Sequence, residues 1–334
     1  MLIYMDKKRY MITDCAVSLC KKLGKGGVSG FVNAFLRRFD LEEVNKALPQ
    51  GDEGEAIACA YPLHAYKLLK AEYGERAKAI ATAESKGVSV RFERGEDEYL
   101  HRAHIDTPFS EKYAHYIFEN FTRDDAFDNG AYTFQSVGSI AICDCVEGCE
   151  RLLDACSAPG GKSVLLSKKC KVVTAFELHE HRTQLIAQYK YRMGVENIQE
   201  FCKDSTVFDP AYKEQFDGVL CDVPCSGFGT VSENPDVKLF KKEGDVASLN
   251  CTQLQILNTC SQYVKHGGAL YYSTCSIFQA ENDVIVEQFL KEHSEFTVQT
   301  LSSPLVHEKK KYGLQFLPDT AYGAGFFVCK MIRK

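Results

Sequence analysis

The sequence lacks any apolar run of the roughly 18–20 residues that a helix needs to cross a bilayer. The N-terminus also lacks the apolar stretch of a signal peptide, because Lys7, Lys8 and Arg9 interrupt it almost at once. Internal repeats and low-complexity tracts are absent as well. We therefore expect a cytosolic protein without a membrane partner, whose 334 residues suffice for one large domain and one or two small ones.

The sequence also lacks the residue spacings that are typical of metal sites, although the chain contains 15 cysteines. The densest cluster does not follow the paired C-x-x-C spacing of common zinc sites, and no histidine lies near it in the sequence. Its members are Cys143, Cys145, Cys149 and Cys156. We expect most of the cysteines to be small buried side chains in a reducing compartment, and we expect no bound metal.

A strong excess of positive charge is missing too, since the net charge is −5, which argues weakly against a nucleic-acid partner. The charge is uneven, however: residues 1–38 carry eight basic side chains against the two acids Asp6 and Asp14, a local charge of +6. The basic residues are Lys7, Lys8, Arg9, Lys21, Lys22, Lys25, Arg37 and Arg38. Such a segment can bind phosphates or be a solvated helical face, and the sequence leaves both interpretations open.

The first 131 residues are predicted to form two small parts. Residues 1–50 have a helical pattern that breaks at the glycines from Gly24 to Gly27, and a stripe at helical spacing is predicted to be buried: Val32, Phe35, Leu36 and Phe39. Residues 51–131 are predicted to hold linker helices and a small α+β subdomain. The expected order is a linker at Pro49–Glu55, helices over Pro62–Ala83 interrupted at Gly74, and a strand at Val88–Phe92.

Residues 132–334 alternate between strand and helix patterns. The predicted strands are Arg151–Cys156, Val172–Leu178, Ile198–Cys202, Gly218–Asp222 and Gly268–Thr274, with two edge strands at Phe296–Gln299 and Gly325–Met331. Helices are predicted from Gly161, over Glu180–Met193, Ser248–Val264 and Glu281–Lys291. This alternation predicts an α/β fold: a Rossmann-like, mostly parallel, doubly wound sheet that binds ligands beyond the carboxyl ends of its strands.

A nucleoside pocket is predicted at three of these strand ends. The first strand runs into a glycine-rich turn, Asp154-Ala-Cys-Ser-Ala-Pro-Gly-Gly-Lys162, in which glycines let the backbone approach a ligand. It matches neither the dinucleotide fingerprint nor a Walker loop. Glu177 ends the second strand, where a carboxylate suits a ribose diol, and Asp204 follows the third, within reach of an adenine amino group. Any one of these acids could instead cap a helix.

Two cysteines follow the next two strands. Cys225 lies in Asp222-Val-Pro-Cys-Ser-Gly-Phe-Gly229 and Cys275 in Ser273-Thr-Cys-Ser276. Adjacent strand ends should bring both thiols to one mouth of the sheet. A thiol on a glycine-containing, electropositive loop can be a reactive thiolate, whereas a core cysteine is inert.

The segments Asp154–Lys162, Asp222–Gly227 and Ser273–Cys275, in this order and spacing, closely resemble the motifs of the RNA 5-methylcytosine methyltransferases of the Sun/Fmu (RsmB) and NOP2/NSUN family. The resemblance covers about residues 130–331. It continues more weakly upstream, where Asn33–Phe39 looks like the last helix of the NusB-like RNA-binding domain of the bacterial RsmB branch. It implies S-adenosylmethionine as cofactor and RNA, with 16S ribosomal RNA suggested, as substrate of a monomeric enzyme. It also implies that the small α+β subdomain within residues 51–131 binds RNA.

The resemblance also implies roles for single residues. Cys275 would attack the base, Cys225 would help to release the product, and Asp222 would hydrogen-bond the cytosine. The implied cofactor contacts are Cys156, Ser157, Ala158, Pro159, Gly160, Gly161, Lys162, Glu177, Asp204 and Asp222. The chemistry agrees, because thiolate addition at carbon 6 makes carbon 5 of cytosine nucleophilic. The base must be unstacked for this reaction, which favours a single-stranded loop.

Some positions depart from the family pattern. Only the end of the NusB-like domain is recognisable in residues 1–50, so the chain either starts at an internal methionine of a longer protein or has lost that part. The usual D-G-F-F is Ala324-Gly-Phe-Phe327, the basic run common at Ser232–Asp236 is missing, and Leu239 stands at the usual tryptophan. We expect weaker phosphate contact from that loop without loss of the reaction.

Two other functions remain open on the sequence. A DNA cytosine methyltransferase shares the chemistry but would use Cys225 as the nucleophile and would not need Cys275. A catalytically silent RNA-binding factor in ribosome assembly would need neither thiol. The T-C-S motif favours RNA over DNA, and the presence of both cysteines favours an enzyme over a scaffold.

Overall fold

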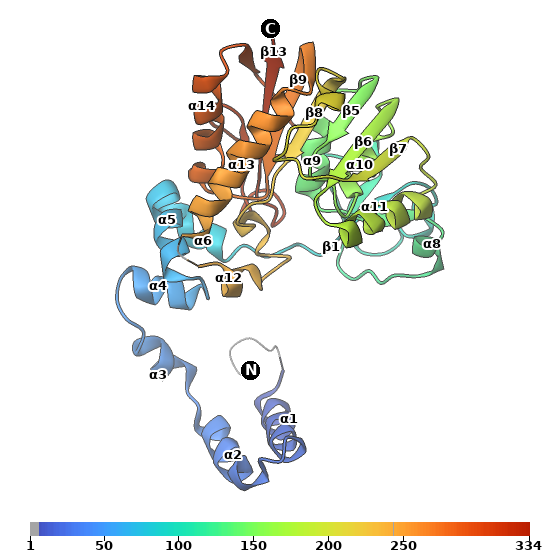
Figure 1. Cartoon of the computed structure of the whole chain (residues 1–334). Helices are drawn as coiled ribbons and strands as arrows, with labels where there is room; N and C mark the ends of the chain where they lie inside the picture. The colour runs from blue at the N-terminus through green and yellow to red at the C-terminus, as the bar shows by residue number, and fades with distance from the viewer. Residues whose placement is uncertain (1–6, 243) are drawn as a thin grey trace. The chain divides into compact units, whose positions relative to one another are not determined.

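Helices make up the first part of the chain and a large sheet the last, in a computed structural model that describes residues 7–242 and 244–334 (Figure 1). The chain divides into two compact units, the first ending at Leu63 and the second running from His64 to Lys334. Asp6, one of the two acids counted in the basic segment, lies outside the described residues. Within the described ranges, no helix combines the length and the apolar character that a membrane span requires.

The first unit is helical, with α1 (Arg9–Lys22), the 3₁₀ turn η1 (Gly26–Val28), α2 (Ser29–Arg38), α3 (Leu41–Lys46) and α4 (Asp52–Ala58). Gly24 has a φ of +70°, which a glycine adopts without strain, and the predicted break between two helices is confirmed there. The linker predicted at Pro49–Glu55 is partly wrong, because α4 begins at Asp52. Its acidic residues occupy the first turn of α4, where the helix dipole favours negative charge.

The stripe predicted to be buried on α2 is also wrong. Phe35 is 53% exposed, and Val32, Leu36 and Phe39 are only half-buried. α1 and α2 form a hairpin, in which the Arg9 guanidinium donates to the Arg37 carbonyl at 3.1 Å. Two helices side by side cover only part of an apolar face, and within α2 no residue is fully buried.

The second unit opens with α5 (Leu63–Tyr73), the turn η2 (Gly74–Arg76) and α6 (Ala77–Ala81), so the interruption predicted at Gly74 is confirmed. A small antiparallel sheet follows in the order β2-β3-β1-β4. Its elements are β1 (Val88–Phe92), η3 (Glu96–Glu98), β2 (His104–Asp106), α7 (Ser110–Tyr113), β3 (His115–Phe118), α8 (Asp125–Asp128) and β4 (Tyr132–Phe134). Because β4 pairs with β1, this sheet extends to Phe134. The predicted division at residues 50 and 131 stays a prediction.

A nine-stranded sheet forms the body of the second unit, in the order β11-β12-β13-β9-β8-β5-β6-β7, with β10 also paired to β13. Its strands are β5 (Arg151–Asp154), β6 (Val172–Glu177), β7 (Ile198–Cys202), β8 (Phe216–Asp222), β9 (Val264–Thr274), β10 (Phe296–Gln299), β11 (Glu308–Lys309), β12 (Leu314–Phe316) and β13 (Phe326–Arg333). The five strands β5 to β9 pair in parallel. The predicted α/β Rossmann-like class is confirmed.

One predicted edge strand is wrong. β13 pairs with β9 along one side, while its other side pairs with β12 and β10, so it is an inner strand. The short strand β12 covers its first half and is itself paired with β11, and the sequence analysis predicted neither of these two strands.

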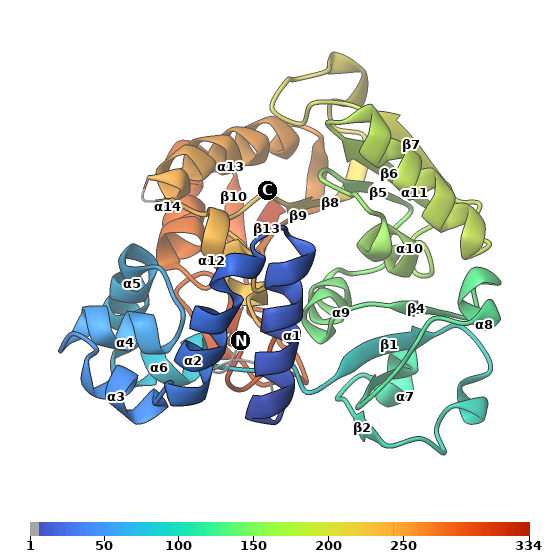
Figure 2. The same cartoon turned by 90° about the horizontal axis from the view of Figure 1, so that it is seen from below.

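Helices cover both faces of the large sheet (Figures 1 and 2). One layer contains α9 (Val137–Cys145), α10 (Gly161–Leu166) and α11 (Glu180–Arg192), and the other contains α13 (Asp245–Ser261) and α14 (Asp283–Glu292). Side chains alternate between the layers: Leu152 and Leu220 pack with the first, Leu153 and Val219 with the second. The remaining short elements are η4 (Pro210–Tyr212), η5 (Phe228–Thr230), α12 (Val237–Phe240) and η6 (Gln279–Glu281).

The order of the parallel strands creates a switch point. From β5 the chain proceeds to β6 and β7 on one side, and then returns to β8 and β9 on the other. Loops at the carboxyl ends of β5 and β8 therefore diverge, and a crevice is expected between them. Register places Asp222 directly opposite Ser273, so the two cysteine-bearing loops leave the sheet side by side.

Candidate active site

A cavity of about 360 Å³ lies at the carboxyl ends of the parallel strands. Seven of the residues predicted for cofactor or base line it: Cys156, Ala158, Glu177, Asp204, Asp222, Cys225 and Cys275. Val223 and Ile256 add apolar surface, and Arg182 adds a cation that the sequence analysis did not single out. The structure thus brings residues from five separate loops to one cavity, as the strand-end argument predicts.

The rest of the predicted cofactor loop does not line this cavity. The hydroxyl of Ser157 donates to the Phe176 carbonyl at 2.9 Å and ties the loop to β6. Gly160 has a φ of +106°, and a Cβ there would lie 3.3 Å from the ring of Tyr189 on α11. The glycine is therefore required by the backbone turn and by a close helix contact. Cofactor contacts by Ser157, Pro159, Gly160, Gly161 and Lys162 stay a prediction.

Glu177 is a buried carboxylate at the end of β6. Its Oε1 accepts the amide N–H of His179 at 3.1 Å and lies 3.3 Å from the guanidinium of Arg182. Among the described residues both contacts fall on Oε1, and the residue faces the cavity. This geometry suits a carboxylate that receives a hydroxyl from a ligand.

Asp204 is more loosely placed. Its Oδ1 accepts the amide N–H and the hydroxyl of Thr206, at 2.8 and 2.6 Å, in a local turn. The side chain is exposed and also lines the cavity. Asp204 therefore stabilises a local turn and is not the N-cap of a helix, because Asp209 caps the following helical turn η4.

Asp154 begins the glycine-rich turn and is only 1% exposed. Burial raises the pKa of its carboxyl to about 6, although the hydroxyl of Ser163, which donates at 2.6 Å, opposes this shift. The bond ties the end of β5 to α10, so Asp154 holds the loop and does not reach the cavity.

Asp222 ends β8 and has two partners in the described structure. Its Oδ1 accepts the hydroxyl of Ser273 at 2.7 Å, and its Oδ2 forms an ion pair with the ammonium of Lys162 at 2.7 Å. Burial opposes the charge on Lys162, but the Asp222 carboxylate outweighs it and raises the pKa of the lysine. Lys162, predicted as a cofactor contact, therefore lies beside the residue predicted to bind the base.

The two cysteines form the centre of the site. The Sγ atoms of Cys225 and Cys275 are 3.0 Å apart, and the amide N–H of Cys275 donates to the Cys225 Sγ at 3.2 Å. Both residues are half-buried at the wall of the cavity. The hydrogen bond to Cys275 and burial raise the pKa of the Cys225 thiol well above its ordinary value.

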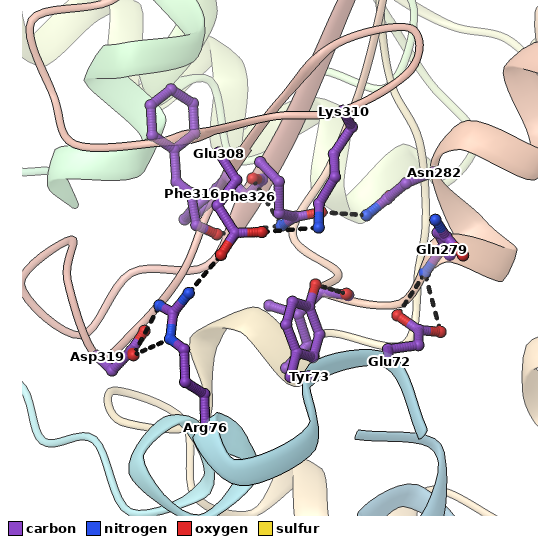
Figure 3. A network of polar contacts seen from close by, with 12 residues as sticks. Glu72, Tyr73, Arg76, Gln279, Asn282, Glu308, Lys310, Phe316, Asp319 and Phe326 are labelled. Carbon is purple, nitrogen blue, oxygen red and sulfur yellow. Dashed lines mark hydrogen bonds and ion pairs between the residues drawn. The ribbon is translucent and has the colours of Figure 1, made fainter. Parts of the chain in front are cut away.

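Side chains from α5 support the loop that follows Cys275 (Figure 3). The Tyr73 hydroxyl donates to the Ile277 carbonyl at 2.6 Å, and the carboxylate of Glu72 accepts the amide N–H of Gln279 at 3.0 Å. Arg76 forms an ion pair with Asp319 at 2.8 Å and another with Glu308. The sequence analysis treated these positions only as part of a helical stretch, since nothing in their spacing shows that they reach residues about 200 positions away.

Comparison with solved structures identifies the class of fold. A methyltransferase homolog protein from Pyrococcus horikoshii matches with a TM-score of 0.72 and 21% identity, over 86% of this chain and all of that one. This likeness confirms the Rossmann-like α/β fold.

Comparison with protein families identifies the family to which the chain belongs. The family described as "16S rRNA methyltransferase RsmB/F" matches residues 144–332, more than half of the chain. The chain belongs to this family, and the predictions of the family and of S-adenosylmethionine as cofactor are confirmed.

Two relatives show how far the likeness extends. The probable ribosomal RNA small subunit methyltransferase B of Bacillus subtilis is 36% identical over 219 residues, which are 62% of this chain and 49% of that protein. Ribosomal RNA small subunit methyltransferase B of Xanthomonas campestris is 28% identical over 96% of this chain and 75% of its own length. The chain therefore spans about half of the first relative and three quarters of the second in these matches.

Proposed function

We propose that this protein transfers a methyl group from S-adenosylmethionine to carbon 5 of a cytosine in RNA, through a covalent adduct with Cys275. One observation carries the proposal: two thiols from adjacent parallel strands lie 3.0 Å apart at a cavity that also contains the strand-end carboxylates. Carbon 5 of cytosine is a weak nucleophile, and a thiol that adds to carbon 6 splits one difficult step into two easier ones. A second thiol is useful only if the adduct must later be resolved.

The geometry of the pair supports a division of labour. In this proposal Cys275 attacks carbon 6, and Cys225, whose Sγ lies 3.0 Å from that of Cys275, is the second thiol at the same base. After methyl transfer, the proton on carbon 5 must leave and the bond from carbon 6 to the Cys275 sulfur must break. Cys225 lies close enough to assist that elimination.

Asp222 is placed to act on the ring of the base. Ser273 and Lys162 hold its two oxygens from opposite sides, and the residue faces the cavity beside both thiols. A carboxyl group at the ring nitrogen stabilises the charge that develops on addition of the thiolate. Lys162 supports this contact by fixing Asp222 through their ion pair.

The other wall of the cavity fits the cofactor. S-adenosylmethionine supplies an electrophilic methyl group on a sulfonium centre when it is bound. Glu177 can accept ribose hydroxyls, Asp204 can accept an adenine amino group, and Val223 and Ile256 offer apolar contact to the flat base. Both polar and apolar parts of a nucleoside therefore find matching groups.

RNA is the proposed substrate, and 16S ribosomal RNA its proposed source. This rests on the names of the relatives, which are ribosomal RNA small subunit methyltransferases. The cysteine pair lies within a cavity, so the base must leave its stack to react. A cytosolic location and a monomeric state stay predictions.

The two alternatives fit the site less well. A DNA-type enzyme would use Cys225 as nucleophile and would not need Cys275, whereas here both thiols line the cavity. A silent scaffold gives no reason for two thiols in contact at a cavity with Asp222.

Release of tritium from carbon 5 tests the proposal. The protein is incubated with S-adenosylmethionine and an unmodified 16S ribosomal RNA transcript that contains 5-tritiated cytidine. We expect one tritium to be released for each methyl group transferred, because the substituent at carbon 5 must leave. Methyl transfer without tritium release would place the methyl group on another atom, and no transfer to RNA at all would leave the scaffold as the better account.

A further inference from the structure

Glu281 is a buried carboxylate that the proposed chemistry does not use. It is 0% exposed, in η6, six residues after Cys275. Among the described residues no lysine, arginine or histidine forms an ion pair with it. A carboxylate without water or a cation is costly unless neutral donors replace both, so its partners should explain why it is there.

The partners of Glu281 come from both cysteine-bearing loops. Its Oε1 accepts the amide N–H of Ser226 at 2.7 Å, and its Oε2 accepts the hydroxyls of both Ser226 and Ser276. Ser226 directly follows Cys225, and Ser276 directly follows Cys275. The two serine hydroxyls are 3.3 Å from each other.

A fourth donor comes from the helix that packs behind the site. The side-chain amide of Gln253 on α13 donates to Glu281 Oε1 at 3.1 Å and to the carbonyl of Pro224 at 3.0 Å. The Tyr272 hydroxyl donates to the Glu281 backbone carbonyl at 2.6 Å, which anchors the residue itself to β9. All four donors to the carboxylate are neutral, and Gln253 is fully buried.

We propose that Glu281 is a positioning residue that holds the loops of Cys225 and Cys275 together, through the serine that follows each cysteine. This inference rests on the proposed function, because it matters only if both thiols act on one base. The serine of each motif then has a role: it fixes the cysteine before it to a shared acceptor. Misplacement of a reacting group by about 1 Å can cost about 100-fold in rate.

Glu281→Gln is the sharpest variant. It keeps the size of the side chain but replaces one acceptor oxygen with an NH₂ group. The tolerated orientation turns that group toward the two serine hydroxyls, which can rotate to accept. The remaining oxygen then receives the Ser226 amide N–H and the NH₂ group of Gln253, which also donates to the Pro224 carbonyl. We expect the variant to fold and to bind S-adenosylmethionine as the parent does, while kcat for tritium release falls by about 10–100-fold. Glu287→Gln, an exposed change on α14, is the matched control and should keep the parental kcat.

Serine variants keep the test decisive if Glu281→Gln does not fold. Ser226→Ala and Ser276→Ala each remove one hydroxyl, and each should lower kcat by about 5–10-fold without changing the KM for S-adenosylmethionine. Their effects should not be additive, because both act through one carboxylate.

Tritium release by the parental protein tests the proposed function separately from this inference. If it releases no tritium, the proposed function fails. If it does, and folded Glu281→Gln or the folded serine variants turn over at the parental rate, Glu281 is only a packing group and the inference is overturned.

Discussion

At the ends of β6 and β7, the carboxylates that face the cavity contact their own sequence neighbours: Glu177 contacts His179 and Arg182, and Asp204 contacts Thr206. At the ends of β8 and β9 the contacts join distant segments. Cys225 meets Cys275 and Asp222 meets Ser273 across about 50 residues, and Tyr73 reaches Ile277 across about 200. The side of the cavity with Glu177 and Asp204 is the cofactor wall, and the side with Asp222, Cys225 and Cys275 is the reaction wall. Local contacts hold the two carboxylates of the cofactor wall, whereas the contacts of the reaction wall form only once the sheet has formed.

This difference matches what each wall must do. A cofactor enters and leaves in every cycle, and carboxylates held by short local contacts can exchange a partner for a ligand hydroxyl. Two thiols that act on one carbon–carbon bond must keep a fixed separation, and buried long-range hydrogen bonds provide that rigidity. Changes on the cofactor wall should therefore alter binding, and changes on the reaction wall should alter turnover.

The largest effect on the cofactor wall is expected from Glu177→Ala. Loss of the carboxylate should weaken S-adenosylmethionine binding by about 1–3 kcal/mol, which is about 5–150-fold in Kd. Isothermal titration calorimetry measures this change in Kd directly. Glu180→Ala, an exposed change in the first turn of α11, is the control. Unchanged affinity in Glu177→Ala would remove its assignment to the ribose.

A pH-dependent effect on stability is expected from Glu72, whose carboxylate supports the loop that follows Cys275. Burial raises the pKa of Glu72 from 4.5 to about 7, while the Gln279 amide and Lys310 oppose the shift and the charge of Glu281 adds to it. Between pH 4.5 and about 7, Glu72 binds its proton more tightly in the folded state than in the unfolded state. The contribution of Glu72 to the stability of the folded protein therefore falls as pH rises through this range.

Glu72→Gln should remove this pH-dependent loss of stability, because glutamine does not ionise. The difference in unfolding free energy between Glu72→Gln and the parent should therefore grow in favour of the variant from pH 5 to pH 8, as measured by urea denaturation. Glu75→Gln, an exposed change in η2, should show no such trend. Parallel pH profiles for Glu72→Gln and the parent would mean that Glu72 is not desolvated in solution.

The smallest effect is expected from the basic first unit, which belongs to neither wall. Lys21, Lys22, Arg37 and Arg38 are exposed there. Reversing their charges should weaken RNA binding and lower its salt dependence, each lost phosphate contact reducing the slope by about 0.7–0.9. Reversing Lys171 and Lys291, exposed in the second unit, is the control. A salt slope equal to that of the parent would identify the first unit's basic residues as a solvated face.

The same contrast explains what the sequence could predict. Strands β5 to β9 follow from apolar runs bounded by turns, and Glu177, Asp204, Asp222 and the cysteines follow from their places at strand ends. Glu281 and Tyr73 could not be found in this way. Tyr73 and Ile277 lie about 200 residues apart, and Glu281 joins the nearby Ser276 to Ser226, 55 residues away. Neither Glu281 nor Tyr73 stands at a position that strand order alone brings to the cavity.

The errors have a similar origin. β13 is an inner strand because β12 and β10 pair with its outer side, and the three residues of β12 are too short to show a period. The stripe on α2 has helical spacing, but spacing cannot reveal how much of a face its partner helix covers.

The most direct test of the central claim compares two single variants on one denaturing gel. Cys225→Ala and Cys275→Ala are each incubated with labelled S-adenosylmethionine and a 16S ribosomal RNA transcript. We expect Cys225→Ala to accumulate a covalent protein–RNA complex that carries the methyl label, because addition proceeds and elimination stalls. We expect Cys275→Ala to form neither complex nor product. A complex with Cys275→Ala but not with Cys225→Ala would contradict the account and make Cys225 the nucleophile.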